Sequence, residues 1–463
     1  MPRILIRAGK LPYEPMDPFT SLRTVVTGTN VGNMLFSQSV FKALSLPQND
    51  LRANGFGLRP GDAPRINDSC DMLVLPLANQ FRLEFGDRLD AMATTIRKLK
   101  VPVVVVGVGC QTDLLYNFDN LRPIDASVKR FVGAVLDKSA TIGVRGHCTG
   151  DYLTSLGFNA VDVIGCPSMF MDGPTLASPR PISSFDRSTK LAMNVTSPSH
   201  QSKFAARLDV MGQVIGHAVA KYDDIGYISQ EDRSLHDLLF GTPRDHGEHA
   251  AIPAEAFAKI YDAGGVKAVV DPRAWMDYLR DRQFVFGTRL HGGIAGLLAG
   301  TAARLVATDS RTLEIAEYFD IPHFKVTDVV PDCDPRFAYE SADYSRMVSG
   351  HRQRFETFAT FLSKNGLGNV YSDGDGGRAF DAKLAAADLS PIISPLPRSQ
   401  EVALRMSWTR TALEQQAVVA ADLVEAGSAK GILRRLRTRA TRSVRALRLH
   451  RRRLQGASHK GAR

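Results

Sequence analysis

Residues 284–307 restrict the fold of this chain more than any other stretch. An apolar, aromatic run that stops at Gly287 is typical of a buried strand. A helix rich in glycine, alanine and leucine begins near His291 and ends at Gly300, and a second apolar strand covers 303–307. Because a strand–turn–helix–strand unit belongs to a parallel sheet with helices on its faces, the sequence predicts an α/β protein.

The turn of this unit carries Arg289, Leu290 and His291. In open parallel sheets, ligands bind at the carboxyl ends of the strands, where the free N–H groups of a following helix favour an anion. An arginine adds a bidentate fork for carboxylate or phosphate, and a histidine adds a group that carries a proton near neutral pH. The turn therefore predicts an anion site with acid–base chemistry. The alternative is that Arg289 forms a surface ion pair and that His291 has no chemical role.

Length and cysteine content limit the domain organisation and the compartment. At 463 residues the chain exceeds one compact core, so we expect at least two domains. Its five cysteines are scattered and form no C-x-x-C pair, which argues against a disulfide framework or a zinc ribbon and for a reducing compartment. No apolar run has the length of a signal-peptide core or a membrane span. We therefore expect a cytoplasmic protein.

The net charge of +10 is concentrated at the C-terminus. Residues 430–463 hold 13 of the 58 basic side chains and no acidic one, which leaves 45 basic and 48 acidic side chains elsewhere. This near-neutral remainder gives no reason to expect nucleic acid as a partner. An apolar stripe at helical spacing runs through the tail, formed by Leu433, Leu436, Ala440, Val444 and Leu447. The stripe predicts a helix on an anionic membrane surface, at the inner face of the plasma membrane, with a solvated, disordered tail as the alternative.

Apolar runs and helical segments alternate from about residue 20 to residue 170. The expected strands are 23–27, 71–77, 101–106, 141–145 and 161–165. This alternation predicts one doubly wound domain over residues 1–180.

After a segment rich in proline and serine at 174–188, a second alternation begins. Its expected strands are 190–196, 225–229, 266–270, 284–287, 303–307 and 323–326. It predicts a second α/β domain over residues 181–370, in which a helix at 344–362 packs back across the first. Residues 371–400 are expected to be a flexible linker and 401–463 a helical, strongly basic tail.

Three motifs occur in order along these domains: GTNVGN at 28–33, VRGHCT at 144–149 and TRLH at 288–291. With them, the chain resembles the polysaccharide pyruvyl transferase family over about residues 20–330. The resemblance implies two Rossmann-like domains facing a cleft, as in B-type glycosyltransferases. It implies phosphoenolpyruvate as the donor. The implied acceptor is a sugar of a cell-surface polysaccharide or of its lipid-linked precursor, and the implied product is a pyruvate ketal.

The resemblance also implies roles for individual residues. Arg145 matches the family's arginine after a strand, and Arg289 and His291 match its Arg-x-His. Together with Leu290 they are expected to bind phosphoenolpyruvate, with no other cofactor and no metal. We hypothesise that His291 is the general acid that protonates the methylene carbon of the donor.

Candidates for binding the acceptor are polar side chains at strand ends of the first domain, namely Asn30, Asn33, Asn79 and Gln111. A structural role in a turn is the alternative for each of them. At Asn33 the chain departs from the family, because many members carry aspartate there. If that aspartate contacts or deprotonates the acceptor, the role is in doubt here.

Other functions remain open at this point. A nucleotide-sugar glycosyltransferase of the same architecture would need an acidic side chain for the ribose, for which Glu314 is the candidate. A non-catalytic scaffold for glycan assembly would tolerate loss of Arg289 and His291. The cluster DHGEH at 245–249 is interpreted as a solvated polar segment rather than a metal site.

Overall fold

The computed structural model of the chain describes residues 1–24, 26–196, 208–240 and 248–395, together with 406, 409, 410, 413 and 414. One compact unit comprises Met1–Leu235 and Arg244–Pro395, and a second comprises His236–Pro243 and Leu396–Arg463. The basic segment 430–463 lies outside the described residues, so its helix and its membrane contact stay predictions. No helix among the described residues is long and apolar enough to cross a membrane.

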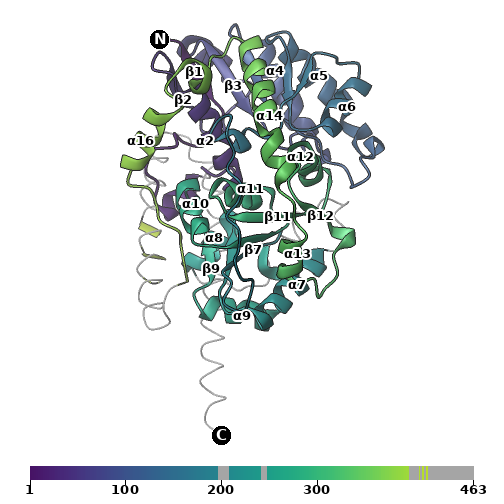
Figure 1. Ribbon diagram of the computed structural model, residues 1–463. Helices are drawn as coiled ribbons and strands as arrows, with labels where there is room; N and C mark the ends of the chain where they lie inside the picture. The colour runs from purple at the N-terminus through teal and green to yellow at the C-terminus, as the bar shows by residue number, and fades with distance from the viewer. Residues whose placement is uncertain are drawn as a thin grey trace. The chain divides into compact units, whose positions relative to one another are not determined.

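The N-terminal half of the first unit is built on a parallel sheet with the strand order β2-β1-β3-β4 (Figure 1). Its strands are β1 (Arg3–Ile6), β2 (Asp50–Ala53), β3 (Met72–Pro76) and β4 (Val103–Val106). Two further strands, β5 (Ile142–Val144) and β6 (Val161–Val163), pair in parallel beside it. A bridge between Val108 and Val144 connects them to the end of β4.

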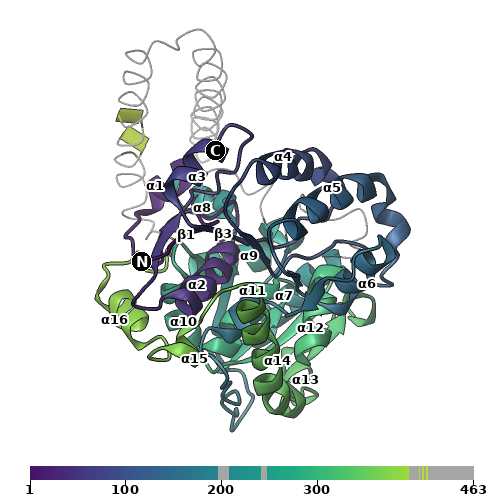
Figure 2. The same cartoon turned by 90° about the horizontal axis from the view of Figure 1, so that it is seen from above.

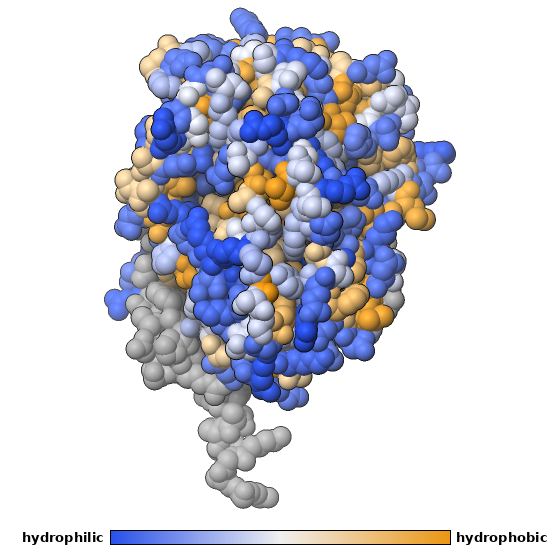
Figure 3. All heavy atoms as spheres, in the orientation of Figure 1, coloured by the Kyte–Doolittle hydropathy of each residue, from blue (hydrophilic) through white to orange (hydrophobic). Residues whose placement is uncertain are grey.

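Both faces of this sheet are buried, because alternate side chains along each strand point to opposite faces. In β4, Val104 and Val106 join one apolar cluster with α2, whereas Val103 and Val105 join another with α4 and α5. Figure 2 shows α2 on one side of the sheet and α4 and α5 on the other. The helices of this half are α1 (Pro18–Thr24), α2 (Gly32–Leu44), α3 (Ala63–Ser69), α4 (Gly86–Arg97), α5 (Asp125–Leu136) and α6 (His147–Ser155). Polar side chains cover most of the face drawn in Figure 3, as expected around an enclosed apolar core.

The second half is built on a parallel sheet with the strand order β12-β11-β10-β7-β8-β9. Its strands are β7 (Leu191–Asn194), β8 (Ile225–Ser229), β9 (Val266–Ala268), β10 (Phe284–Gly287), β11 (Ala302–Ala307) and β12 (His323–Lys325). Its helices are α7 (Leu208–Lys221), α8 (Asp232–Phe240), α9 (Ala254–Asp262), α10 (Pro272–Arg280), α11 (Leu290–Leu298), α12 (Ser310–Phe319) and α13 (Pro335–Glu340). The predicted α/β fold with two Rossmann-like halves is confirmed.

The long helix α14 (Ser345–Lys364) packs back against the first half, as the sequence predicts. The ring of Phe358 stacks on Phe170 with 5.1 Å between ring centroids. Just beyond the helix, Asn365 Oδ1 accepts hydrogen bonds from the backbone N–H groups of Ala140 (3.1 Å) and Thr141 (3.3 Å). These contacts tie α14 to the edge of the first sheet near β5.

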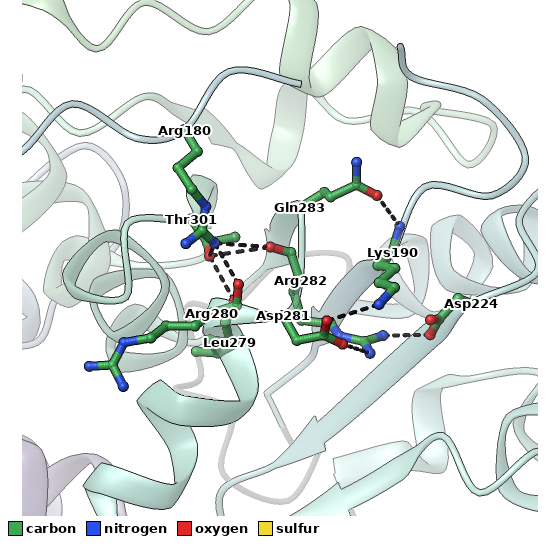
Figure 4. Close-up of polar contacts among 9 residues, drawn as sticks. All are labelled: Arg180, Lys190, Asp224, Leu279, Arg280, Asp281, Arg282, Gln283 and Thr301. Atoms are coloured by element: carbon green, nitrogen blue, oxygen red, sulfur yellow. Dashed lines mark hydrogen bonds and ion pairs between the residues drawn. The ribbon is translucent and has the colours of Figure 1, made fainter. Parts of the chain in front are cut away.

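A polar cluster fixes the chain where it enters β10 (Figure 4). Arg180 donates hydrogen bonds to the carbonyl of Arg280 (2.7 Å) and to Thr301 Oγ1 (2.9 Å). Lys190, just before β7, forms an ion pair with Asp281 (2.9 Å). The cluster ties β10 to its neighbouring strand, and so fixes the strand that ends in the Arg-x-His turn.

Two sequence predictions about secondary structure are wrong. The described residues of the segment 23–27 form no strand, because α1 reaches Thr24. The N-terminal strand is β1, whose run of four residues is too short to stand out. The segment 371–400 is not a flexible linker over its described part. Helices α15 (Val370–Asp373) and α16 (Arg378–Ala386) form there, and Ile393 pairs with Ala268 of β9. The Gly- and Asp-rich composition reflects turns at helix ends rather than disorder.

Candidate active site

A cavity of about 610 Å³ lies at the carboxyl ends of strands from both sheets. The first half lines it with residues that follow β1, β3 and β5, and the second half with residues that follow β7, β8, β10 and β11. The predicted site residues that line it are Asn30, Asn33, Asn79, Arg145, Arg289, Leu290 and His291. The topology therefore brings together side chains that lie far apart in the sequence.

Arg145 follows β5 directly and is only 2% exposed. Its Nε donates to the carbonyl of Gly107 (3.3 Å), whereas its buried Nη2 has no hydrogen-bond partner among the described residues. A side chain at Gly109 would not fit, because its Cβ would lie 2.3 Å from Arg145 Cδ. Burial lowers the pKa of Arg145. A buried cation whose hydrogen-bonding capacity is unmet is costly, and an anion in the cavity would meet it.

Arg289 is the N-cap residue of α11, with extended backbone geometry. Its backbone N–H donates to Asn194 Oδ1 (2.8 Å), and its Nε donates to the carbonyl of Val195 (3.3 Å). Its guanidinium forms an ion pair with the buried carboxylate of Glu231, which follows β8. The pair holds the side chain of Arg289 in place and balances its charge in the empty cavity.

His291 lies in the first turn of α11, with its Nε2 3.8 Å from Cys166 Sγ. Helix α2 of the first half approaches it closely: a Cβ at Gly32 would lie 2.6 Å from His291 Nδ1. Burial and the charge of Arg145 lower the pKa of His291 to about 3. This lowered pKa favours the neutral imidazole at pH 7, and an anion that offsets the charge of Arg145 would favour its protonation.

The segment formed by the loop with Asn30 and the first turn of α2, where Asn33 lies, is strained and is held by its own polar groups. Thr29, a β-branched residue, has a φ of 79°, a backbone conformation that is costly for such a residue and typical of functional sites. Asn30 Oδ1 accepts from the N–H of Gly32 (2.8 Å), and Asn33 Nδ2 donates to the carbonyls of Thr27 (3.1 Å) and Gly28 (3.3 Å). An aspartate at position 33 could not donate these bonds, so asparagine here stabilises the loop.

Asn79 and Gln111 belong to a chain of hydrogen bonds that joins the halves. Asn79 Nδ2 donates to Gln111 Oε1 (3.0 Å), and Gln111 Nε2 donates to Asp309 Oδ2 (3.2 Å). Asn79 lines the cavity, but Gln111, 7% exposed, does not. Gln111 therefore contacts Asn79 rather than the cavity, and its predicted contact with the acceptor stays a prediction.

Sequence reasoning missed four arginines that line the cavity: Arg7, Arg82, Arg88 and Arg311. Arg7 follows β1, a strand that was not predicted, and Arg82 and Arg88 lie several residues beyond the end of β3. Arg311 forms an ion pair with Asp309 (2.6 Å). A signal was present in the sequence, since arginines follow several strands that share one edge of a sheet. Recognising that these arginines cluster requires the strand order.

Glu314 is not available for a ribose. It is 2% exposed, and its carboxylate accepts hydrogen bonds from the backbone N–H (3.1 Å) and the hydroxyl (2.9 Å) of Thr149. It joins α12 to α6 and does not line the cavity. The nucleotide-sugar alternative therefore loses the acidic residue on which it depended.

The buried carboxyl of Glu314 predicts a measurable pH dependence of stability. Burial raises its pKa to about 7 from the ordinary 4.5. The native state therefore binds more protons than the unfolded state between these pH values, so that stability from this group is greatest below pH 4.5 and is lost as the pH rises to about 7. In urea unfolding at a series of pH values, Glu314→Gln should lose less stability over this interval than the unmodified protein. Equal losses would contradict the assignment, and Glu356→Gln, on the exposed face of α14, is the control.

The model of the family described as polysaccharide pyruvyl transferase matches residues 30–310, more than half of the chain. The chain belongs to the polysaccharide pyruvyl transferase family. The match includes Arg145, Arg289 and His291, which the cavity brings together from the two halves. Membership implies an enzyme that transfers a pyruvyl group.

A search of the curated proteins finds no match. Solved structures share only a distant likeness. A functionally uncharacterised protein of Klebsiella pneumoniae is 13% identical, with a TM-score of 0.36 over 68% of this chain and 87% of that one. The trehalose 6-phosphate synthase of Burkholderia multivorans is 11% identical, with a TM-score of 0.39 over 83% and 96%. A UDP-N-acetylglucosamine 2-epimerase is 10% identical, with a TM-score of 0.38 over 78% and 95%. No conclusion rests on likenesses of this strength.

Among the residues that the structure describes, no group of three or more His, Cys, Asp and Glu side chains is placed to hold a metal ion. Part of the cluster at 245–249 lies outside them.

Proposed function

We propose that this protein transfers pyruvate from phosphoenolpyruvate to two hydroxyl groups of a sugar in a cell-surface polysaccharide or its precursor. The observation that carries the proposal is the buried guanidinium of Arg145, a residue that lines the cavity and whose Nη2 has no hydrogen-bond partner among the described residues. Phosphoenolpyruvate supplies a carboxylate and a phosphate in a compact molecule. Either group satisfies a guanidinium bidentately.

The donor has a second fixed cation and a helix end to bind. Arg289 stands at the N-cap of α11, and the free N–H groups of that helix's first turn favour an anion. Leu290 and His291 follow in the same turn and line the same cavity. The proposed position of the donor is therefore between Arg145 of the first half and the Arg-x-His turn of the second.

The reaction needs one proton to be delivered to carbon. The methylene carbon of phosphoenolpyruvate takes a proton from His291, and a sugar hydroxyl oxygen forms a bond to the neighbouring carbon. The bond from that carbon to the phosphate oxygen breaks, and a second hydroxyl closes the ketal. One hydroxyl proton restores His291 and the other leaves with the phosphate, so that donor and diol give ketal and inorganic phosphate.

Binding of phosphoenolpyruvate should itself cause His291 to take up a proton. The anionic donor offsets the charge of Arg145, which together with burial keeps the pKa of His291 low in the empty cavity. Calorimetric titrations in buffers of different ionisation enthalpy should show that the unmodified protein takes up more protons on binding phosphoenolpyruvate than His291→Gln does. Equal uptake by the two proteins would show that His291 does not receive this proton.

The proposed activity is tested by incubating the protein with phosphoenolpyruvate and glycan precursors. The expected result is release of inorganic phosphate that depends on the acceptor, with a new ketal methyl signal in the NMR spectrum of the glycan. Phosphate release with free pyruvate as the only product would contradict transfer. The predicted cytoplasmic location, and the membrane contact through residues 430–463, stay proposals based on the sequence.

A further inference from the structure

In addition to the donor residue Arg145, three arginines of the first half line the cavity. Arg7 directly follows β1, Arg82 precedes the short helix η1 (Leu83–Phe85), and Arg88 lies in the first turn of α4. They come from three separate segments, so their convergence on one cavity is a property of the fold and not of one basic stretch.

Aromatic rings lie against the guanidinium groups of these side chains. The guanidinium carbon of Arg82 lies 3.7 Å from the ring centroid of Phe85, and that of Arg88 lies 5.2 Å from the same centroid. The guanidinium of Arg7 lies 4.9 Å from the ring centroid of Phe56. Stacking orients a guanidinium without neutralising it, which leaves its N–H groups directed for bidentate binding.

None of the three arginines forms an ion pair with a carboxylate among the described residues. Among the described residues, the guanidinium of Arg7 donates one long hydrogen bond, from Nη1 to the carbonyl of Pro76 (3.4 Å), and the buried Nε of Arg82 has no hydrogen-bond partner. Burial and the charge of Arg88 lower the pKa of Arg7 to about 9. Burial and the charge of Arg311 lower the pKa of Arg82 to about 10. These three arginines therefore gather positive charges in one cavity without a paired carboxylate among the described residues.

Phosphoenolpyruvate cannot neutralise these three arginines and also the positive charges of its own binding site. Phosphoenolpyruvate has two anionic groups, and the donor site offers them Arg145, the protonated form of His291 and the first turn of α11, while the guanidinium of Arg289 is already paired with Glu231. Arg311 also lines the cavity, but its charge is paired with Asp309, so it is not counted with these three arginines. The three arginines thus offer positive charge in the same cavity beyond that of the donor residues.

We propose that Arg7, Arg82 and Arg88 form a second anion subsite, which binds the phosphate groups that link the acceptor sugar to its carrier. The inference rests on the proposed function for the identity of the other substrate. Asn30, Asn33 and Asn79 line the same cavity and offer amide groups to the sugar itself. The carrier diphosphate would be that of a lipid or of a nucleotide, since the recognised chemistry is the same.

The test is a calorimetric titration of the full chain with inorganic pyrophosphate, in the presence of saturating phosphoenolpyruvate. We expect binding at one site, weakened at least about tenfold in Arg82→Gln and in Arg88→Gln, because a charge-assisted hydrogen bond is lost in each. Arg97→Gln, an exposed arginine at the other end of α4, should bind like the unmodified protein. Arg88 is itself exposed, so its replacement should leave the fold intact, which thermal melting checks.

Titration with farnesyl diphosphate and with UDP-glucose then distinguishes the two carriers, and tighter binding of either supports the subsite. The proposal is overturned if pyrophosphate does not bind, if it only competes with phosphoenolpyruvate, or if glucuronate binds at these arginines and pyrophosphate does not. Failure of the proposed donor is separable from failure of the subsite. If phosphoenolpyruvate does not bind at all, pyrophosphate binding that persists in Arg145→Gln and is lost in Arg88→Gln still supports the subsite.

Discussion

Replacing Arg145 with glutamine should weaken the binding of phosphoenolpyruvate by about 100-fold, because a bidentate charge-assisted contact in a buried site is lost. The same change should leave the empty protein no less stable. Arg145 is 2% exposed and its Nη2 has no hydrogen-bond partner in the described part of the chain, so its removal relieves the burial of a charge. A residue whose role is structural would show the opposite pattern.

The matched control is again Arg97→Gln, which removes an exposed arginine from the same half. Binding is measured by calorimetry and stability by urea unfolding. If Arg145→Gln bound phosphoenolpyruvate as well as the control, or if it lost stability together with binding, Arg145 would not be a donor ligand of the kind argued above.

Replacing His291 with glutamine should lower turnover by about 10²–10⁴, the range expected for loss of a general acid, while donor binding changes much less. The neutral imidazole that burial and Arg145 enforce in the empty cavity makes a small contribution to donor affinity. The main contribution of His291 comes after the bound donor has raised its pKa, when His291 transfers the proton to carbon in the transition state. The expected signature is therefore a fall in kcat with little change in the KM for phosphoenolpyruvate.

Two further variants separate this chemical role from a general disturbance. His323→Gln changes a partly exposed histidine in β12, outside the cavity, and should keep full turnover. Gly32→Ala keeps His291 but places a Cβ 2.6 Å from its unmoved Nδ1, so it should displace the ring and lower turnover as well. Near-full turnover in His291→Gln would refute the general-acid role.

The fold could be predicted from the sequence wherever a strand was a continuous apolar run with a clear helix after it. The run at 101–106 and the unit at 284–307 are of this kind, and both appear where expected. β1 is too short to be distinguished from an apolar patch, and the composition of 371–395 conceals helices that pack through a few buried residues such as Phe380.

The site was predictable only where chemistry and local spacing coincide. Arg289 and His291 share one turn, so their proximity follows from the sequence. The ion pair of Arg289 with Glu231 does not, because it depends on β8 and β10 lying on either side of β7. The same holds for Arg7, Arg82 and Arg88, whose convergence requires the strand order and the packing of α4.

The measurement that tests the central claim most directly is calorimetric titration of the purified, unmodified protein with phosphoenolpyruvate and, separately, with a panel of nucleotide sugars. The account predicts saturable binding of phosphoenolpyruvate at one site, in a cavity that Arg145, Arg289 and His291 line. Saturable binding of a nucleotide sugar with no binding of phosphoenolpyruvate, even when glycan precursor is added, would contradict it.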